Sequence, residues 1–179
     1  MTERASPPVT IRELDADGYR AAIPDLAALL VDAVDSGAGV NFLAGVTADE
    51  TAAWWAERID QVRDGVISAF AALDDERVVG STLLIRSSNP NSPHRAEIGK
   101  VLVHSSARRR GIATALMTAA EERARADGRW MLMLDTVTGS AAEAFYRSQG
   151  WVELGVMPNH ALATDGTPAA TTFFWKDLR

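Results

Sequence analysis

The stretch Ala107–Ala126 reads ARRRGIATALMTAAEERARA and places three consecutive arginines directly before a glycine and the start of a helical pattern. It follows an apolar run at Val101–Val103 that is typical of a strand. It precedes Trp130–Leu134, five consecutive apolar residues that predict a strand buried on both faces, as parallel strands are. A strand, a helix and a buried strand in this order predict a crossover unit in a mixed α/β fold.

The remainder of the chain divides into further strand and helix patterns separated by polar turns. The additional strands are expected at residues 9–14, 67–73, 78–87, 96–104, 151–156 and 171–176. Further helices are expected at residues 19–35 with an early break at Pro24, at 47–65 with Thr47 as cap and Gly65 as stop, and at 141–150. Two helices therefore precede most of the sheet.

The composition is that of one globular domain with an acidic balance. The chain has 179 residues, 47% of them hydrophobic, which suits a single domain with a substantial core. A formal net charge of -6 argues against a general binder of nucleic acid or of anionic membranes. The absence of cysteine excludes disulfides, thiolate metal sites and a cysteine nucleophile. Since no apolar run could span a membrane, we expect a cytoplasmic protein with one domain at residues 8–179 and a flexible tail at residues 1–7.

The three arginines predict a local anion site. The first turn of a helix exposes unpaired N–H groups, and Gly111 lets a ligand approach the backbone closely. Because the helix dipole supplies only about 0.3–1 kcal/mol, tight binding of a di- or triphosphate group would also need Arg108, Arg109 and Arg110. The alternative is a solvated basic helix end. Neither GxxxxGK[ST] nor GxGxxG occurs, so nucleotide sites of those two kinds are unsupported.

Residues 108–113, RRRGIA, match the pattern [Q/R]-x-x-G-x-[G/A], and LDTVTGSAAEAFYRSQGW follows at residues 134–151. Together the two segments resemble the hallmarks of the GNAT acetyltransferase superfamily, which uses acetyl-coenzyme A. The resemblance implies a GNAT fold, with a central twisted mixed β-sheet of six to seven strands flanked by about four helices. Two positions depart from the commonest form, Ala113 in place of a second glycine and Ser140 in place of asparagine.

The resemblance also implies a cofactor site. The backbone of Val101, Leu102 and Val103 would pair with the pantetheine arm like an extra strand. The pyrophosphate would be held by Arg108, Arg109, Arg110, Gly111, Ile112, Ala113 and Thr114. Ser140 and Tyr146 would contact the cofactor farther along, with Tyr146 facing its sulfur. No metal is expected, since His94, His104 and His160 lack metal-ligand spacing.

Longer segments are similar to the tabtoxin resistance subfamily, whose members acetylate a small amino-acid-like toxin. These segments are residues 26–45, 95–103, 134–146 and 158–176. Turn signals at Asp165–Pro168, followed by an apolar strand, predict a hairpin loop over the acceptor side of the sheet. A pocket closed in this way suits a small-molecule amine, toxin-like or antibiotic-like, better than a protein tail. The sequence leaves a homodimer open.

Acetyl transfer from a thioester to an amine needs a neutral amine, a donor for the oxyanion and a proton for the departing thiolate. An amine with a pKa of about 10 is mostly protonated at neutral pH, so a carboxylate must take a proton. Glu97 and Asp135 are the candidates for that step, and Tyr146 is the candidate acid for the thiolate. The structural alternatives are a solvent-facing strand residue for Glu97, a turn residue for Asp135 and a core aromatic residue for Tyr146.

We therefore predict an N-acetyltransferase that moves the acetyl group of acetyl-coenzyme A directly to an amine in a ternary complex, with no metal and no nucleic-acid partner. Acetylation of a protein amine and a noncatalytic acyl-coenzyme A-binding domain are the alternatives. Trp54 and Trp55 are adjacent and cannot share one helix stripe, so one is expected in the core and the other partly exposed.

Overall fold

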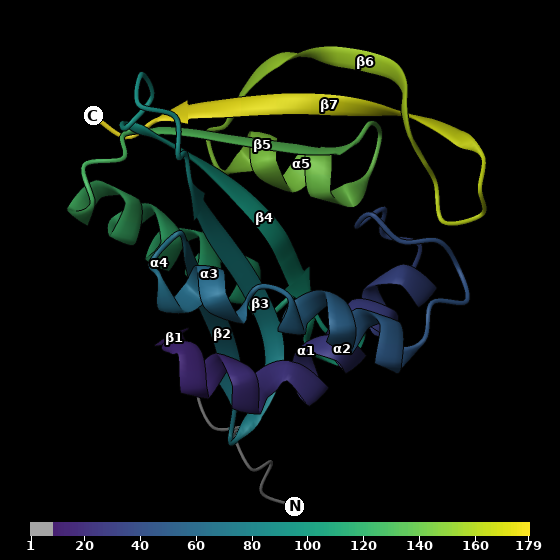
Figure 1. The fold of residues 1–179 in the computed structure, drawn as a ribbon. Helices are drawn as coiled ribbons and strands as arrows, with labels where there is room; N and C mark the ends of the chain where they lie inside the picture. The colour runs from purple at the N-terminus through teal and green to yellow at the C-terminus, as the bar shows by residue number, and fades with distance from the viewer. Residues whose placement is uncertain (1–8) are drawn as a thin grey trace, which may run out of the picture.

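Seven strands form one mixed sheet in the order β1-β2-β3-β4-β5-β7-β6 (Figure 1). The computed structural model describes residues 9–179, so the flexible tail predicted at residues 1–7 lies outside the described residues. The strands are β1 (Thr10–Leu14), β2 (Ile67–Asp74), β3 (Arg77–Arg86), β4 (Arg95–Val103), β5 (Met131–Val137), β6 (Val152–Leu162) and β7 (Pro168–Asp177). Among neighbouring strands β4 and β5 are parallel, and the other pairs are antiparallel. This is the predicted crossover, because the arginine helix joins β4 to β5.

Helices cover both faces of the sheet. They are α1 (Ala16–Asp35), α2 (Ala48–Ala56), α3 (Ile59–Arg63), α4 (Ile112–Ala126) and α5 (Ala141–Ser148), with a 3-10 turn η1 (Ser105–Ala107) before α4. The helices α1, α2 and α3 pack on one face, where Leu30 and Trp55 are fully buried. The helices α4 and α5 pack on the other, where Leu116 is fully buried. Strand β2 alternates between the two cores, with Ala71 facing one and Ala72 the other.

Two helix predictions were wrong in detail. Pro24 lies inside a continuous α1, because a proline removes one backbone hydrogen bond while the buried face of the helix continues around it. The helix expected at 47–65 is divided into α2 and α3. At the break, the Arg58 guanidinium donates a hydrogen bond to the Trp54 carbonyl. The ends of this segment are as predicted: Thr47 forms a capping box, and Gly65 has a positive φ of 71° after α3.

The expectation of a β5 buried on both faces was also wrong. Leu132 and Leu134 are buried, but Met131 and Met133 are only partly buried and Asp135 is exposed. Met133 and Asp135 line a cleft. The last two strands are longer than expected and form an extended hairpin (Figure 1). β6 is the sheet edge, and it exposes five large apolar side chains: Val152, Leu154, Val156, Met157 and Leu162.

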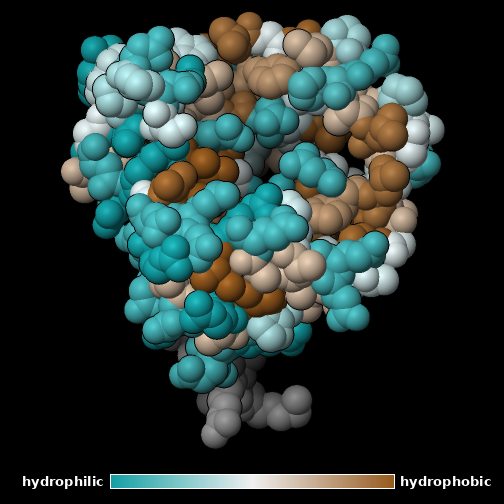
Figure 2. All heavy atoms as spheres, in the orientation of Figure 1, coloured by the Kyte–Doolittle hydropathy of each residue, from teal (hydrophilic) through white to brown (hydrophobic). Residues whose placement is uncertain are grey.

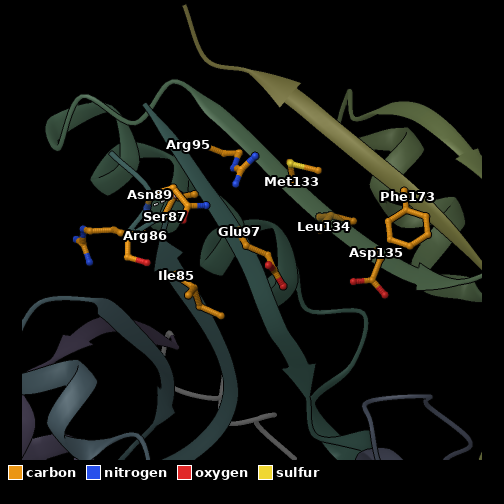
Figure 3. Close-up of a pocket in the computed structure, with 12 residues that line it drawn as sticks. Ile85, Arg86, Ser87, Asn89, Arg95, Glu97, Met133, Leu134, Asp135 and Phe173 are labelled. Atoms are coloured by element: carbon orange, nitrogen blue, oxygen red, sulfur yellow. Dashed lines mark hydrogen bonds between the residues drawn. The ribbon is translucent and has the colours of Figure 1, made fainter. Parts of the chain in front are cut away.

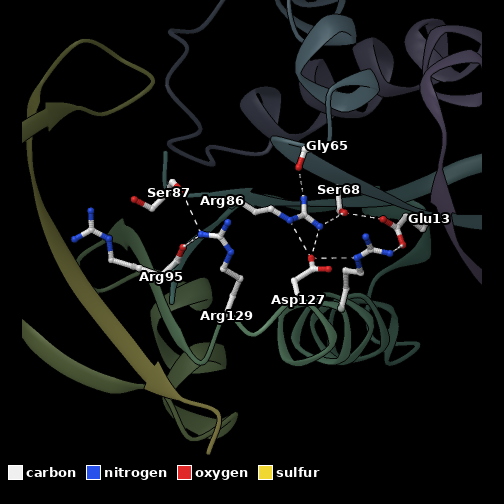
Figure 4. A network of polar contacts seen from close by, with 9 residues as sticks. Glu13, Gly65, Ser68, Arg86, Ser87, Arg95, Asp127 and Arg129 are labelled. Carbon is white, nitrogen blue, oxygen red and sulfur yellow. Dashed lines mark hydrogen bonds and ion pairs between the residues drawn. The ribbon is translucent and has the colours of Figure 1, made fainter. Parts of the chain in front are cut away.

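A polar network fastens the end of the sheet where β4 and β5 begin (Figure 4). Arg86 on β3 pairs with the carboxylate of Asp127 at the end of α4 and donates to the Ser68 hydroxyl at 2.9 Å. Arg129, just before β5, donates to the carbonyl of Arg95 at the start of β4 at 3.3 Å. These contacts join β2, β3, β4 and α4 at one end and leave the other ends of β4 and β5 unconstrained by them.

Candidate active site

The parallel strands β4 and β5 pair over three residues and then separate. Arg95 to Glu97 pair with Met131 to Met133, and no further β4–β5 pair is present within residues 9–179. β4 continues to pair with β3, and β5 continues to pair with β7, so each strand keeps one satisfied edge. The separation leaves backbone N–H and C=O groups of the second half of β4 without a strand partner on the β5 side.

β4 also contains a bulge. The β3–β4 register shifts within Gly99–Leu102, where two β4 residues lie opposite one β3 residue. The extra residue reverses the side-chain alternation, so Ile98 and Val101 both pack on the α4 face although they are three apart. Lys100, with φ +52°, thereby joins Glu97 on the opposite face, towards α2. A non-glycine residue at positive φ is uncommon and marks a locally constrained backbone.

The loop before α4 has the open geometry that the sequence predicts. Gly111 is the N-cap at φ +76°, no side chain caps this helix end, and an added Cβ would meet nothing within 4 Å. The first N–H groups of α4 are therefore available to a ligand. The arginines differ from one another: Arg110 is paired with Asp74 at 2.6 Å, and Arg108 donates to the Val103 carbonyl at 3.3 Å.

Arg109 is the arginine of this loop that remains free. Its φ is +62°, its side chain is exposed, and it forms no hydrogen bond or ion pair with other residues in the range 9–179. The loop is fixed from α1, because Asp32 accepts from the Ser105 N–H at 2.8 Å and from the Ser105 hydroxyl at 2.6 Å. The predicted triple-arginine site is thus one free cation beside two that already have protein partners.

Tyr146 on α5 is 7% exposed and packs against Phe145, Trp151 and Phe174. Burial raises the pKa of its hydroxyl, and the nearby carboxylate of Asp135 raises this pKa further. The hydroxyl forms no hydrogen bond within residues 9–179. Tyr146 is therefore a core aromatic residue, which was the alternative considered for it from the sequence. Its hydroxyl is also a protonated donor without a protein acceptor.

Glu97 and Asp135 face the same cleft from the two diverging strands (Figure 3). The cleft has a volume of about 410 Å³, and the space-filling view shows this face of the molecule hollowed near its middle (Figure 2). Although Glu97 is open to the cleft, partial burial raises its pKa, and the Asp135 carboxylate raises that pKa further against the opposing charges of Lys100 and Arg95. A carboxylate with a raised pKa is a stronger base than an ordinary one.

Comparison with known proteins shows to which family a chain with this site belongs. A family model described as "Acetyltransferase (GNAT) family" matches residues 40–151, more than half of the chain. The chain belongs to the GNAT acetyltransferase family. The GNAT fold predicted from the sequence is confirmed by the mixed seven-stranded sheet and by its structural neighbours.

Three solved structures illustrate the similarity of this GNAT chain to others. An N-acetyltransferase from Staphylococcus aureus Mu50 is 20% identical with a TM-score of 0.78, covering 96% of this chain and 99% of that one. A Salmonella typhimurium protein solved with its cofactor acetyl-CoA is 20% identical with a TM-score of 0.77, covering 96% and 95%. A ribosomal-protein-alanine N-acetyltransferase from Brucella melitensis is 28% identical with a TM-score of 0.72, covering 94% and 99%.

The GNAT chain is accordingly an acetyl-coenzyme A-dependent N-acetyltransferase, with acetyl-coenzyme A as its cosubstrate. Within residues 9–179 no group of three or more His, Cys, Asp and Glu side chains could hold a metal ion. Across the same residues, none of the helices is both long enough and apolar enough to pass through a membrane.

The sequence analysis missed a cationic and aromatic wall beside the two carboxylates. The Lys100 ammonium lies 4.6 Å from the centroid of the Trp54 ring, and the Arg58 guanidinium lies 3.3 Å from the same ring. Trp54 is half-buried while Trp55 is fully buried, which confirms the expectation for this pair. The sequence predicted that one of the two tryptophans is partly exposed, and Trp54 is that residue. The position of the Lys100 side chain depends on the β4 bulge, which no sequence pattern predicted.

Ser140 caps α5 by accepting a hydrogen bond from the Glu143 N–H at 3.2 Å, and its hydroxyl lies 3.4 Å from that of Thr136. A cap of this kind is a sufficient structural reason for serine at this position. Its predicted contact with the cofactor stays a prediction.

Proposed function

We propose that this GNAT enzyme acetylates the amine of a small, amino-acid-like acceptor of the toxin or antibiotic type, by direct transfer within a ternary complex. The observation that carries the proposal is the pair of carboxylates, Glu97 and Asp135, facing one cleft of about 410 Å³, with Asp135 close enough to Tyr146 to raise the pKa of its hydroxyl. Ligand pockets for small molecules have volumes of about 300–1,000 Å³.

For the cofactor, we assign the pantetheine arm to the unpaired edge of Val101, Leu102 and Val103 and the pyrophosphate to the start of α4. Three observations support this fit: the separation of β4 from β5, the uncapped N-terminus of α4, and the free space at Gly111. An exposed strand edge pairs readily with an extended ligand, and a helix N-terminus favours phosphate. Arg109 is the free cation that would meet the phosphates, with N–H groups at Ile112, Ala113 and Thr114.

Bound acetyl-coenzyme A supplies an activated acyl group, and the protein residues manage protons around it. The carboxylates of Glu97 and Asp135 hold the acceptor ammonium and remove one proton from it, either directly or through water. Tyr146 then donates its proton to the departing thiolate. A tyrosine hydroxyl with an ordinary pKa of about 10 is already protonated at neutral pH. The raised pKa of Tyr146 preserves that state.

Two contacts join the loop between α1 and α2 to β5 and to the β6–β7 turn. The loop between α1 and α2 reaches the β6–β7 turn, where the Ala44 N–H donates to the Thr164 carbonyl at 2.8 Å. The same loop lies against the end of β5, since a Cβ added at Gly39 would come within 2.6 Å of the Val137 side chain. A hairpin turn tied to a loop in this way supports a pocket of limited size rather than an open groove for a peptide.

The second candidate is acetylation of a protein amine. It is favoured by the 28% identical Brucella melitensis neighbour, which is named as a ribosomal-protein-alanine N-acetyltransferase. The discriminating experiment is thiol release from acetyl-coenzyme A with a panel of amino acids, toxin-like amines and peptides. The proposal expects a small amine to exceed every peptide in kcat/KM. Preference for long peptides would refute it in favour of the second candidate.

We further infer that any homodimer would form through β6. This edge strand exposes Leu154 at 65% and four other large apolar side chains, and an unpaired edge of this kind invites a second copy. Sedimentation of the wild-type chain and of Leu154→Lys tests this. A dimer that Leu154→Lys leaves intact would place the interface elsewhere.

A further inference from the structure

A cation that the reaction as described does not use lies beside the two carboxylates of the acceptor cleft. Lys100 is half-buried, and its ammonium forms no ion pair and donates no hydrogen bond within residues 9–179. Lys176, by contrast, pairs with Glu121 at 2.7 Å. A lysine held inside a site without a protein acceptor is an available donor for a ligand.

A strained backbone holds Lys100 on the Glu97 face of β4. Without the β4 bulge, residue 100 would point to the α4 core together with Ala96 and Ile98. The bulge turns it to the face of Glu97 and holds it at φ +52°, a conformation that is strained for a non-glycine residue. Such strain persists where the surrounding structure enforces it.

The surroundings of Lys100 also constrain its charge. Burial lowers its pKa to about 8, the Arg58 guanidinium acts in the same direction, and the carboxylates of Asp135 and Glu97 oppose them. Two carboxylates and Arg95 line the cleft, and two further cations, Lys100 and Arg58, lie beside Trp54. An acceptor with only an amine would pair with the carboxylates and leave Lys100 unpaired.

We propose that Lys100 is a specificity-determining residue that binds an acid group, such as a carboxylate, on the same small acceptor whose amine lies at Glu97 and Asp135. The acceptor is then a zwitterion, and the enzyme selects it over the corresponding neutral amine. This inference rests on the proposed small-amine function. The competing role for Lys100 is electrostatic, lowering the pKa of Glu97, and Arg95 shares that effect from the other side of Glu97.

Lys100→Met, which keeps the chain length and removes the charge, tests the proposal on amino acids and their carboxamides. A lost charge-assisted hydrogen bond should lower kcat/KM for the acids by about 10- to 100-fold, mainly through KM, and change it for the amides by less than about threefold. Arg95→Gln is the matched control, because Arg95 lines the cleft itself and is the other cation that acts on Glu97. It should leave the ratio of acid to amide unchanged.

An equal loss on acids and amides in Lys100→Met would overturn the proposal, as would loss of acid preference in Arg95→Gln instead. Wild-type enzyme that acetylates small amides as well as acids would also overturn it while leaving the small-amine function standing. Exclusive activity on peptides would instead refute the small-amine function.

An NMR titration, which needs no enzymatic turnover, tests directly whether Lys100 binds an anion. Lys100 and Lys176 are the only lysines in the chain, so labelling with [13Cε]lysine gives two NMR signals, and Lys100→Met assigns them. Propionate, as a carboxylate probe, should raise the pKa of the Lys100 signal by about one unit, because a paired anion favours the charged ammonium. Propionamide should not change it, and the Lys176 signal should not respond to either. An unchanged Lys100 titration in saturating propionate would rule out the site.

Discussion

The cofactor side and the acceptor side of the β4–β5 opening are built in different ways. On the cofactor side, the candidate groups for the pantetheine arm and the pyrophosphate run along one continuous segment, residues 101–114, from the unpaired strand edge to the first turn of α4. On the acceptor side, the candidate groups come from α2, the bulge of β4, the end of β5 and the β6–β7 turn. A continuous segment can be conserved in geometry as a unit, whereas a site assembled from distant segments can change its chemistry one residue at a time.

The largest effect should come from the cofactor side. Gly111→Glu places a carboxylate at the start of α4, in open space, next to the expected phosphates. At a separation of about 4 Å and an effective dielectric of about 20, the repulsion is about 4 kcal/mol, so binding should weaken by roughly 10³-fold. Calorimetry with coenzyme A measures this.

Gly128→Glu is the matched control for that variant. Gly128 lies just beyond the other end of α4, also at positive φ, with free space around its Cβ position. It suffers the same backbone strain without approaching the phosphates. Normal affinity in a folded Gly111→Glu protein, or equal loss in both variants, would remove the phosphate assignment from the loop.

Tyr146→Phe should give the next largest effect, because it removes a proton donor and retains the ring. Loss of a general acid costs about 10²–10⁴-fold in turnover, and the lower end is expected because thiolates leave readily. Coenzyme A affinity should change little. Tyr19→Phe is the control, since Tyr19 is the other tyrosine and its hydroxyl donates to the Trp55 carbonyl within the core formed by α1 and α2. Near-normal turnover in Tyr146→Phe would leave Tyr146 a core residue only.

On the acceptor side, Glu97→Gln and Asp135→Asn should each lower turnover by about 10-fold or more near neutral pH. Because the pKa of Glu97 is raised, wild-type activity should fall with acidification at a higher pH than an ordinary carboxyl would give. The loss in both variants should shrink as pH rises, because free amine becomes abundant. Glu76→Gln in the exposed β2–β3 turn serves as control. Variants with the wild-type pH profile would show that the amine loses its proton elsewhere.

The smallest effect should come from opening the acceptor side. Ala44→Pro removes the N–H that donates to the Thr164 carbonyl, a bond worth about 1 kcal/mol. KM for the acceptor should rise by about fivefold, while coenzyme A affinity stays the same. Ala44→Ser keeps the N–H and should behave as wild type. An unchanged KM in Ala44→Pro would mean that this contact does not shape the pocket.

The difference between the two sides also explains what the sequence could predict. The crossover from β4 through α4 to β5, the cap at Thr47 and the glycine at the start of α4 depend on local patterns, and each was found where expected. The continuation of α1 through Pro24 and the break after α2 were not predicted, because tertiary packing overrides local helix signals.

The bulge at Lys100 was missed for a further reason. Strict alternation along AEIGKVLV assigns Lys100 to the α4 face, and only the shifted β3–β4 register reverses this. Glu97 and Asp135 were identified singly, yet their meeting across one cleft depends on how far β4 and β5 diverge. The arrangement of the charged groups on the acceptor side could therefore be seen only in the folded structure.

The central claim is that the opening between β4 and β5 separates a cofactor side from an acceptor side, with the reacting atoms between them. A crystal structure of the enzyme with coenzyme A tests this most directly. The account predicts the pyrophosphate at the N–H groups of residues 112–114, the pantetheine arm along residues 101–103, and the sulfur within hydrogen-bond distance of the Tyr146 hydroxyl, facing Glu97 and Asp135. A sulfur lying away from Tyr146, or a pyrophosphate bound elsewhere than at the start of α4, would contradict it.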